Sequence, residues 1–242
     1  MAITSVSFDF WNTLFTEAPD GFSYYADRRQ SLLQQAVCEF RPVTAEEIIT
    51  ACRAEARLHH SIWISEHRTL RAEERISNCA GSLGVALPAA KLTDLAIAFE
   101  EGILERPPVL IEGARDVVVD LSHKYRLGII SDVGFSPGRV LRQVLRHAGV
   151  LDAFDSLVFS DEAGHSKPHR EVFRLTSVAL GASPAEIAHI GDLEHTDVIG
   201  AKQAGYRAIR FTGVTQMYSN ESTIADAVTE DLRQLPNLLS AF

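Results

Sequence analysis

The sequence predicts an α/β protein in which helices cover both faces of a parallel sheet and an all-helical block follows the first strand. Three observations predict this fold. Short apolar runs alternate with helical patterns from residue 108 to the end of the chain. A separate apolar, β-leaning run over residues 5–8 must join the same sheet. Residues 16–107, which lie between, carry helical patterns and no convincing strand.

The composition is that of an ordinary globular protein. The chain has 242 residues, 46% of them hydrophobic and 23% charged, which leaves room for one large domain or two smaller ones. The net charge of -9 argues against nucleic acid or an anionic membrane as a partner. No apolar run approaches the roughly 18 residues of a spanning helix, and no signal-peptide pattern precedes the first strand. We therefore expect a cytoplasmic protein with its three cysteines reduced.

The inserted block reads as a series of helices. A turn signal over residues 19–21 precedes the first of them. Thr44 and Glu47 have the spacing of a capping box, which predicts the start of a long second helix. Two further helices are expected over residues 71–83 and 88–104.

Strands and helices alternate after residue 108. We expect strands over 126–131, 156–160, 188–191 and 207–211, and helices over 111–123, 137–147, 170–180, 197–204 and 229–239. Ser136 is expected to cap the helix that starts at Pro137. The expected domains are a core of residues 1–15 and 108–242 and an insertion of residues 16–107.

Four polar stretches lie where the predicted strands end. Asp9 ends the first strand, Ser131 ends the second and Asp192 ends a later one. Lys167 lies between a strand and the following helix. Ligands bind beyond the carboxyl ends of the strands in open α/β sheets, so we expect these side chains to form one site.

These stretches resemble the motifs of the haloacid dehalogenase superfamily. The motif residues are Asp9 in DFWNTL, Ser131 in IISD, Lys167 in SKP, and Asp192 and Asp197 in GDLEHTD. The resemblance implies a Rossmann-like catalytic core with a helical cap domain inserted after the first motif. It covers residues 1–15 and 108–242 by motif, and residues 16–107 only in kind.

The resemblance also implies a chemistry. Asp9 would attack a phosphate monoester to form an aspartyl-phosphate, which water then hydrolyses. A Mg²⁺ ion, which prefers hard oxygen ligands, would be held by Asp9, Asp192 and the backbone carbonyl of Trp11. Asp197 would act behind these ligands. Lys167 and Ser131 would contact the transferring phosphoryl group.

Trp11 breaks the pattern, because most phosphatases of this superfamily have a second aspartate two residues after the nucleophile. That aspartate acts as the general acid, and its loss typically costs about 10²- to 10⁴-fold in rate. Three interpretations remain open. The protein is a Mg²⁺-dependent phosphatase with a good leaving group, or with a substitute acid such as Asp132, Glu194, His165 or a cap histidine. It is a metal-free hydrolase similar to the 2-haloacid dehalogenases. Or it binds a phosphorylated ligand without turnover.

The cap is expected to close over the strand ends and to select the substrate, a small and phosphorylated molecule. Asp132, Arg28 and Trp63 are the residues expected to contact it. Helical caps of this kind sometimes mediate dimers, so a homodimer remains open.

Overall fold

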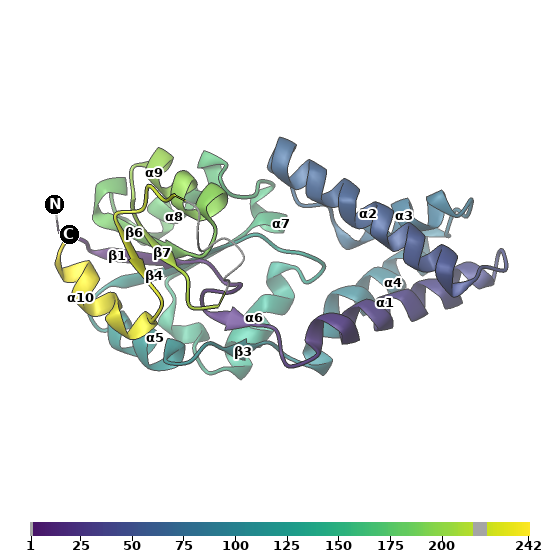
Figure 1. The fold of residues 1–242 in the computed structure, drawn as a ribbon, viewed down its shortest axis with the longest axis horizontal. Coiled ribbons are helices and arrows are strands. Elements are labelled where there is room, and N and C mark those ends of the chain that lie inside the picture. The colour runs from purple at the N-terminus through teal and green to yellow at the C-terminus, as the bar shows by residue number, and fades with distance from the viewer. Residues whose placement is uncertain (1, 215–221) are drawn as a thin grey trace.

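The computed structural model describes residues 2–214 and 222–242. It has two parts, a sheet covered by helices and a group of helices that extends to one side (Figure 1). Among the described residues, no helix is both long and apolar enough to cross a lipid bilayer.

The sheet has six strands, and every neighbouring pair in it is parallel. They are β1 (Ser5–Phe8), β4 (Arg126–Ser131), β5 (Ser156–Phe159), β6 (Ile187–Gly191), β7 (Arg207–Phe211) and β8 (Ala227–Thr229). Their order is β5-β4-β1-β6-β7-β8, so β1 lies inside the sheet between β4 and β6. The carboxyl ends of these three strands are therefore neighbours.

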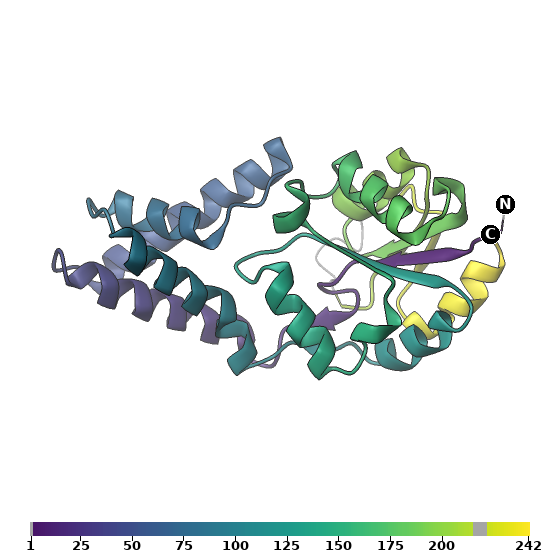
Figure 2. The same cartoon turned by 180° about the vertical axis from the view of Figure 1, so that it is seen from behind.

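Helices cover both faces of the sheet, which confirms the predicted fold class (Figures 1 and 2). The first face carries α5 (Ala114–Ser122), α6 (Gly138–His147) and α10 (Leu235–Ser240), which share one apolar cluster with β1. The second carries α8 (Arg170–Leu180) and α9 (Ile199–Ala204), which pack in a second cluster. The short helix α7 (Ser160–Ala163) follows β5 directly.

The other part, which we call the helical insertion, comprises residues 21–105. It contains α1 (Gly21–Cys38), α2 (Ala45–Glu66), α3 (Ala72–Ser82) and α4 (Ala89–Glu101), followed by the 3₁₀ turn η1 (Gly102–Glu105). The predicted capping box is present, because Thr44 Oγ1 accepts from Glu47 N at 3.2 Å and Glu47 accepts from Thr44 N at 2.8 Å. Leu33, Ile48 and Phe99 lie in a hydrophobic core of the insertion's own.

Two short strands join the helical insertion to the sheet domain. β2 (Phe15–Thr16) enters it and β3 (Val109–Leu110) leaves it, and the two pair antiparallel. The chain therefore crosses between the two parts at one place.

Three details of the sequence prediction were wrong. Residues 227–229 form the edge strand β8, so the last helix starts only at Leu235. Ser136 does not cap α6, because its hydroxyl donates to the Glu100 carbonyl at 3.0 Å while Asp161 accepts from Gly138 N at 3.1 Å. The helical segment expected from residue 197 starts earlier, with the π-helical turn η4 (Glu194–Val198).

Candidate active site

The carboxyl ends of β1, β4 and β6 bring the predicted acidic residues together. Asp9 follows β1 and Asp192 follows β6, while Asp197 projects from η4. Each of the three has a carboxylate oxygen within 4.8 Å of the others, and all three side chains are buried. Residues that are far apart in the chain thus form one compact acidic cluster.

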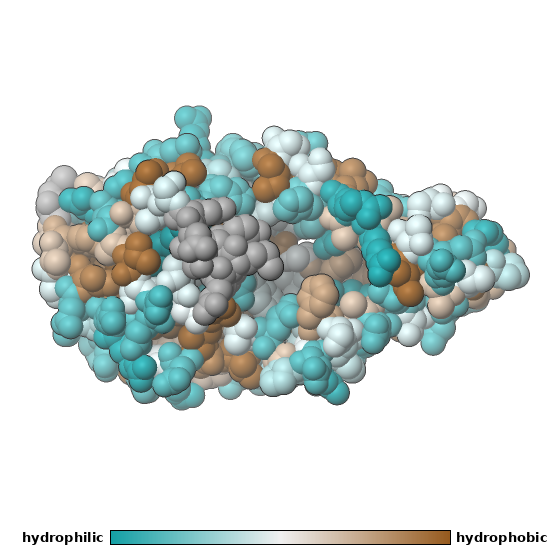
Figure 3. Space-filling model, in the orientation of Figure 1, coloured by the Kyte–Doolittle hydropathy of each residue, from teal (hydrophilic) through white to brown (hydrophobic). Residues whose placement is uncertain are grey.

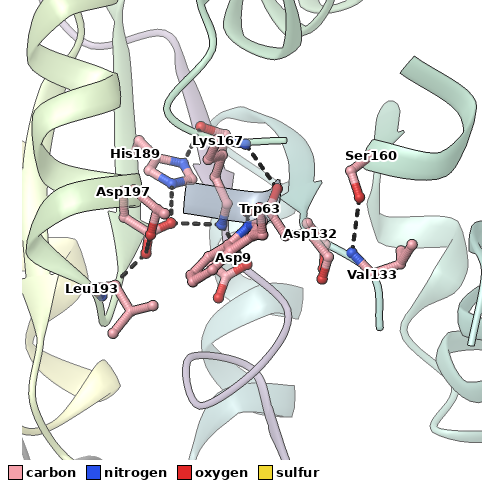
Figure 4. Close-up of polar contacts among 12 residues, drawn as sticks. Asp9, Trp63, Asp132, Val133, Ser160, Lys167, His189, Leu193 and Asp197 are labelled. Atoms are coloured by element: carbon pink, nitrogen blue, oxygen red, sulfur yellow. Dashed lines mark hydrogen bonds and ion pairs between the residues drawn. The ribbon is translucent and has the colours of Figure 1, made fainter. Parts of the chain in front are cut away.

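Lys167 lies against this cluster (Figure 4). Its Nζ donates to Asp9 Oδ1 at 2.6 Å and to Asp197 Oδ1 at 2.6 Å, and its side chain is only 3% exposed. Burial alone would lower the pKa of Lys167, but the neighbouring carboxylates of Asp197, Asp9 and Asp132 raise it well above its usual value. The ammonium group therefore remains charged over the whole physiological range.

Asp197 is held on several sides. His189 Nε2 lies 3.1 Å from its Oδ1, and Leu193 N donates to its Oδ2 at 3.1 Å. A carboxylate only accepts hydrogen bonds, so Nε2 carries the proton and Nδ1 accepts from Ser7 Oγ at 2.9 Å. Burial raises the pKa of Asp197, but Lys167 and His189 lower it more, so the group remains ionised.

Two features of this arrangement are not evident from the sequence. Asp197 lies inside η4 and accepts from the N–H of Leu193, the residue before that turn. His189 contacts Asp197 directly, and no motif in the sequence marks it as part of the site. The role of His189 follows from the register of two neighbouring strands, in which Ser7 on β1 pairs with His189 on β6.

The site suits a divalent cation. Asp9, Asp192 and Asp197 offer buried oxygen donors close together, which is the ligand set that Mg²⁺ prefers. Burial raises the pKa of Asp9 well above its usual range, Lys167 opposes this, and Asp197 and Asp192 add to it. A positive charge in addition to that of Lys167 would relieve the repulsion among the carboxylates of Asp9, Asp192 and Asp197. The donor chemistry and the excess of buried negative charge therefore fit a metal ion.

Trp63 connects the helical insertion to the site. Its Nε1 donates to Asp132 Oδ2 at 2.8 Å, and Asp132 Oδ1 accepts from Lys167 N at 2.8 Å (Figure 4). A second contact lies nearby, where Thr69 Oγ1 is 2.8 Å from Ser160 Oγ and 2.9 Å from Ser166 Oγ. The insertion therefore rests on the strand ends through polar contacts that water can replace.

Ser131 lies at the end of β4 and is 1% exposed. Its hydroxyl donates to the carbonyl of Asp132 at 3.3 Å, a long hydrogen bond that a better acceptor could displace. The structure thus places Ser131 at the same strand edge as the acidic cluster.

A cavity of about 740 Å³ lies between the helical insertion and the strand ends, and Figure 3 shows the surface hollowed there. From the core it is lined by Trp11, Asp132 and residues 133–136. From the insertion it is lined by aromatic, aliphatic and a few charged side chains, among them Tyr25, Arg29, His59, Trp63 and Arg75. Asp9 itself is not among the lining residues, but Trp11, two positions after it, is one of them, so the cavity lies next to the segment that carries the expected nucleophile.

Arg28 lies elsewhere. Its guanidinium bonds Glu105 at 2.9 Å through Nε and the Ala98 carbonyl at 2.8 Å, and it does not line the cavity. Arg29, its neighbour on α1, does line the cavity. One residue corresponds to about 100° around a helix, which is why an adjacent pair points in different directions.

The other candidates for a substitute acid are spread out. Glu194 accepts from Ile224 N at 2.9 Å, and the ring of His165 stacks on His169 with centroids 3.7 Å apart. Neither lines the cavity. His59 does, and burial lowers its pKa from 6.5 to about 4, so its ring is neutral at pH 7.

Comparisons with known proteins agree with this geometry. Residues 3–205 match the family model of the haloacid dehalogenase-like hydrolases. A glyceraldehyde 3-phosphate phosphatase from Pyrococcus abyssi is 33% identical over 102 residues, which is 42% of this chain and 42% of that protein. The chain spans about half the length of the curated relatives it matches.

Solved structures share the fold over the whole chain. A 2-haloacid dehalogenase from Pseudomonas syringae pv. Tomato DC3000 has a TM-score of 0.72 at 22% identity and 99% coverage of both chains. A phosphatase from Thermococcus onnurineus has a TM-score of 0.69 at 21% identity and 98% coverage of both. These two neighbours bear the names of different reactions, so the fold alone does not select one. The family match and the site geometry together show that the chain belongs to the haloacid dehalogenase-like hydrolases.

Proposed function

We propose that this protein is a Mg²⁺-dependent phosphatase that acts on a small phosphorylated metabolite through an aspartyl-phosphate on Asp9. The observation that carries the proposal is the cluster of Asp9, Asp192 and Asp197 with Lys167 bonded to its first and last members. Curated relatives named as phosphatases, including the one from Pyrococcus abyssi, support the same reaction.

In this proposal Asp9 attacks through Oδ2, because Oδ1 accepts from Lys167 Nζ. The bond from Oδ2 to phosphorus forms as the bond from phosphorus to the leaving oxygen breaks, and the leaving oxygen departs with the electron pair. Lys167 and the hydroxyl of Ser131 stabilise the negative charge on the phosphoryl oxygens. Water then attacks phosphorus, the bond from phosphorus to Oδ2 breaks with its electron pair returning to the Asp9 carboxylate, and the protons of the water leave with inorganic phosphate.

Asp9, Asp192 and the backbone carbonyl of Trp11 would hold the Mg²⁺, and Asp197 would fix Lys167 behind them. When bound, the ion neutralises phosphoryl oxygens that would otherwise repel the nucleophile. Buried carboxylates within 4.8 Å of one another support this assignment.

Protonation of the leaving oxygen has no obvious donor in this mechanism, because the indole of Trp11 cannot act as a general acid. Asp132 is an unsuitable replacement, since both its oxygens accept hydrogen bonds, from Lys167 N and Trp63 Nε1. Burial raises the pKa of Asp132 above its usual value even though these bonds favour the ionised form, so it is the engagement of both oxygens that keeps Asp132 from donating to the leaving group. We infer that the preferred substrate has a leaving group that departs with little protonation, such as an acyl or aryl phosphate.

A leaving-group series tests both parts of the proposal. We expect kcat/KM for substituted phenyl phosphates to rise steeply as the pKa of the phenol falls, and acetyl phosphate to be hydrolysed. Activity should disappear with chelator and return with Mg²⁺. A flat dependence on phenol pKa would show that another residue protonates the leaving group, and activity that survives chelation would overturn the metal assignment.

Trp11 favours a second candidate, a metal-independent dehalogenation of 2-haloacids, because halide leaves without a proton. The acidic cluster argues against it, since that reaction needs no metal ligands. Release of chloride from 2-chloropropionate in the presence of chelator would select this candidate. If no substrate of either class reacts, thermal stabilisation by Mg²⁺ with vanadate would indicate a protein that binds a phosphorylated ligand without turnover.

A further inference from the structure

The cavity wall formed by the helical insertion carries three arginines, Arg29, Arg53 and Arg75, and the two that lie over the Phe135 ring, Arg29 and Arg75, differ in their partners. Arg75 is paired, since its Nε and one terminal nitrogen bond the two oxygens of Glu55 at 2.8 and 2.9 Å. This bidentate pair is buried, with side chains 8% and 3% exposed. The charge of Arg75 is therefore already neutralised within the protein.

Arg29 has no such partner. Among residues 2–214 and 222–242, no hydrogen bond or ion pair to its guanidinium is formed. Its Cζ lies 4.3 Å from the centre of the Phe135 ring and 5.8 Å from that of Tyr25. Glu17 attracts it only from beyond ion-pair distance.

The guanidinium of Arg29 is nevertheless positioned. Phe135 carries Arg29 and also Arg75, whose Cζ lies 3.6 Å from the same ring centre. Stacking on an aromatic face holds the plane of a guanidinium while its N–H groups remain available at the edge. Burial and the like charge of Arg75 lower the pKa of Arg29 to about 10, so the group is still charged at pH 7.

We propose that Arg29 binds a carboxylate at the far end of the substrate, so that the preferred substrate is a phosphate ester of an organic acid. This inference rests on the proposed function for the phosphate end, which lies at Asp9. A planar guanidinium with two parallel N–H groups matches a carboxylate in shape.

A carboxylate fits better than a second phosphate. Arg29 supplies one unit of positive charge that Glu55 does not neutralise, which balances a monoanion and leaves a dianion undercompensated. Much of the lining of the cavity is apolar, with Tyr25, Phe99 and Ile103 among its members. This lining suits an apolar or aromatic body between the two anionic ends of the substrate.

The test compares 4-carboxyphenyl phosphate with 4-carbamoylphenyl phosphate, which has nearly the same shape and no charge at the far end. We expect the wild type to prefer the carboxylate by about 10-fold or more in kcat/KM, which corresponds to charge-assisted hydrogen bonds. Arg29→Gln should lower this ratio to the value that the leaving-group dependence alone sets for the two phenols, and Arg29→Lys should keep part of the preference. Arg28→Gln is the matched control, since it removes the same charge one residue away, and it should keep the full ratio.

A binding measurement separates this inference from the reaction itself. The phosphonates 4-carboxybenzylphosphonate and 4-carbamoylbenzylphosphonate are not hydrolysed, and their stabilisation of each variant in Mg²⁺ is read by thermal shift. If the esters react but neither their kcat/KM ratio nor the difference in thermal stabilisation between the two phosphonates depends on Arg29, that result refutes the subsite and leaves the phosphatase standing. If no ester reacts but phosphonate binding depends on Arg29, the subsite stands and the phosphatase is refuted. If neither is seen, both are overturned.

Discussion

Replacing Lys167 with methionine is the sharpest test of the site, because this side chain joins two buried carboxylates. At the observed 2.6 Å, each contact corresponds to about 6 kcal/mol of attraction at an effective dielectric of 20, before desolvation is subtracted. Breaking a buried pair by removing one partner typically costs about 3–5 kcal/mol. For a chain of this length that loss lowers Tm by about 6–20 °C. Turnover should disappear as well.

Lys202→Met is the matched control. Lys202 bonds Asp226 at 2.8 Å, but its side chain is 31% exposed and Arg207 also contacts Asp226 at 3.0 Å. We therefore expect a loss of about 1 kcal/mol or less. Urea unfolding of both variants in chelator gives the two free energies, and a repeat with Mg²⁺ should restore stability to Lys167→Met more than to the control. Equal losses in the two variants would refute the electrostatic account of the site.

Three further predictions follow from the geometry. Gly191→Ala places a Cβ 2.3 Å from Asp197 Cγ, so kcat should fall and stability should drop by about 1–3 kcal/mol. Gly81→Ala, which lies in α3 and meets no atom within 4 Å, should leave kcat unchanged and stabilise the protein by up to about 1 kcal/mol. Burial lowers the pKa of His59 from 6.5 in the unfolded chain to about 4 in the folded protein. As the pH falls through this range, His59 takes up a proton in the unfolded chain before it does so in the folded protein, so the free energy of unfolding decreases. His59→Gln should flatten that decrease in urea titrations at pH 7 and 5. Trp63→Phe removes a 2.8 Å hydrogen bond to the core and should lower kcat/KM about tenfold.

The part of the site that lies at strand ends could be predicted from the sequence. Asp9, Ser131 and Asp192 each follow an apolar run, and parallel strands bring their carboxyl ends to one edge. The long helix after Thr44 was equally clear, because its capping box is a local signal. Such features depend on residues that are near one another in the chain.

The rest depends on packing between distant segments, which the sequence does not display. The sequence does not show which of Arg28 and Arg29 lines the cavity, because this depends on which face of α1 is turned toward it. The roles of His189 and Phe135 need strand register and the approach of the insertion to the core. β8 was missed because a three-residue edge strand carries too little pattern to be recognised.

The chain contains two tryptophans, and both line the same cavity. Trp11 comes from the core and Trp63 from the helical insertion, where its ring also meets His195 edge-on at 5.3 Å. The tryptophan fluorescence of the protein, excited selectively over that of its tyrosines, therefore originates wholly at the cavity, without the background that tryptophans elsewhere would add. Single substitutions to phenylalanine would assign the signal to one wall or the other, so the arrival of a ligand and the movement of the insertion can be timed separately without a label.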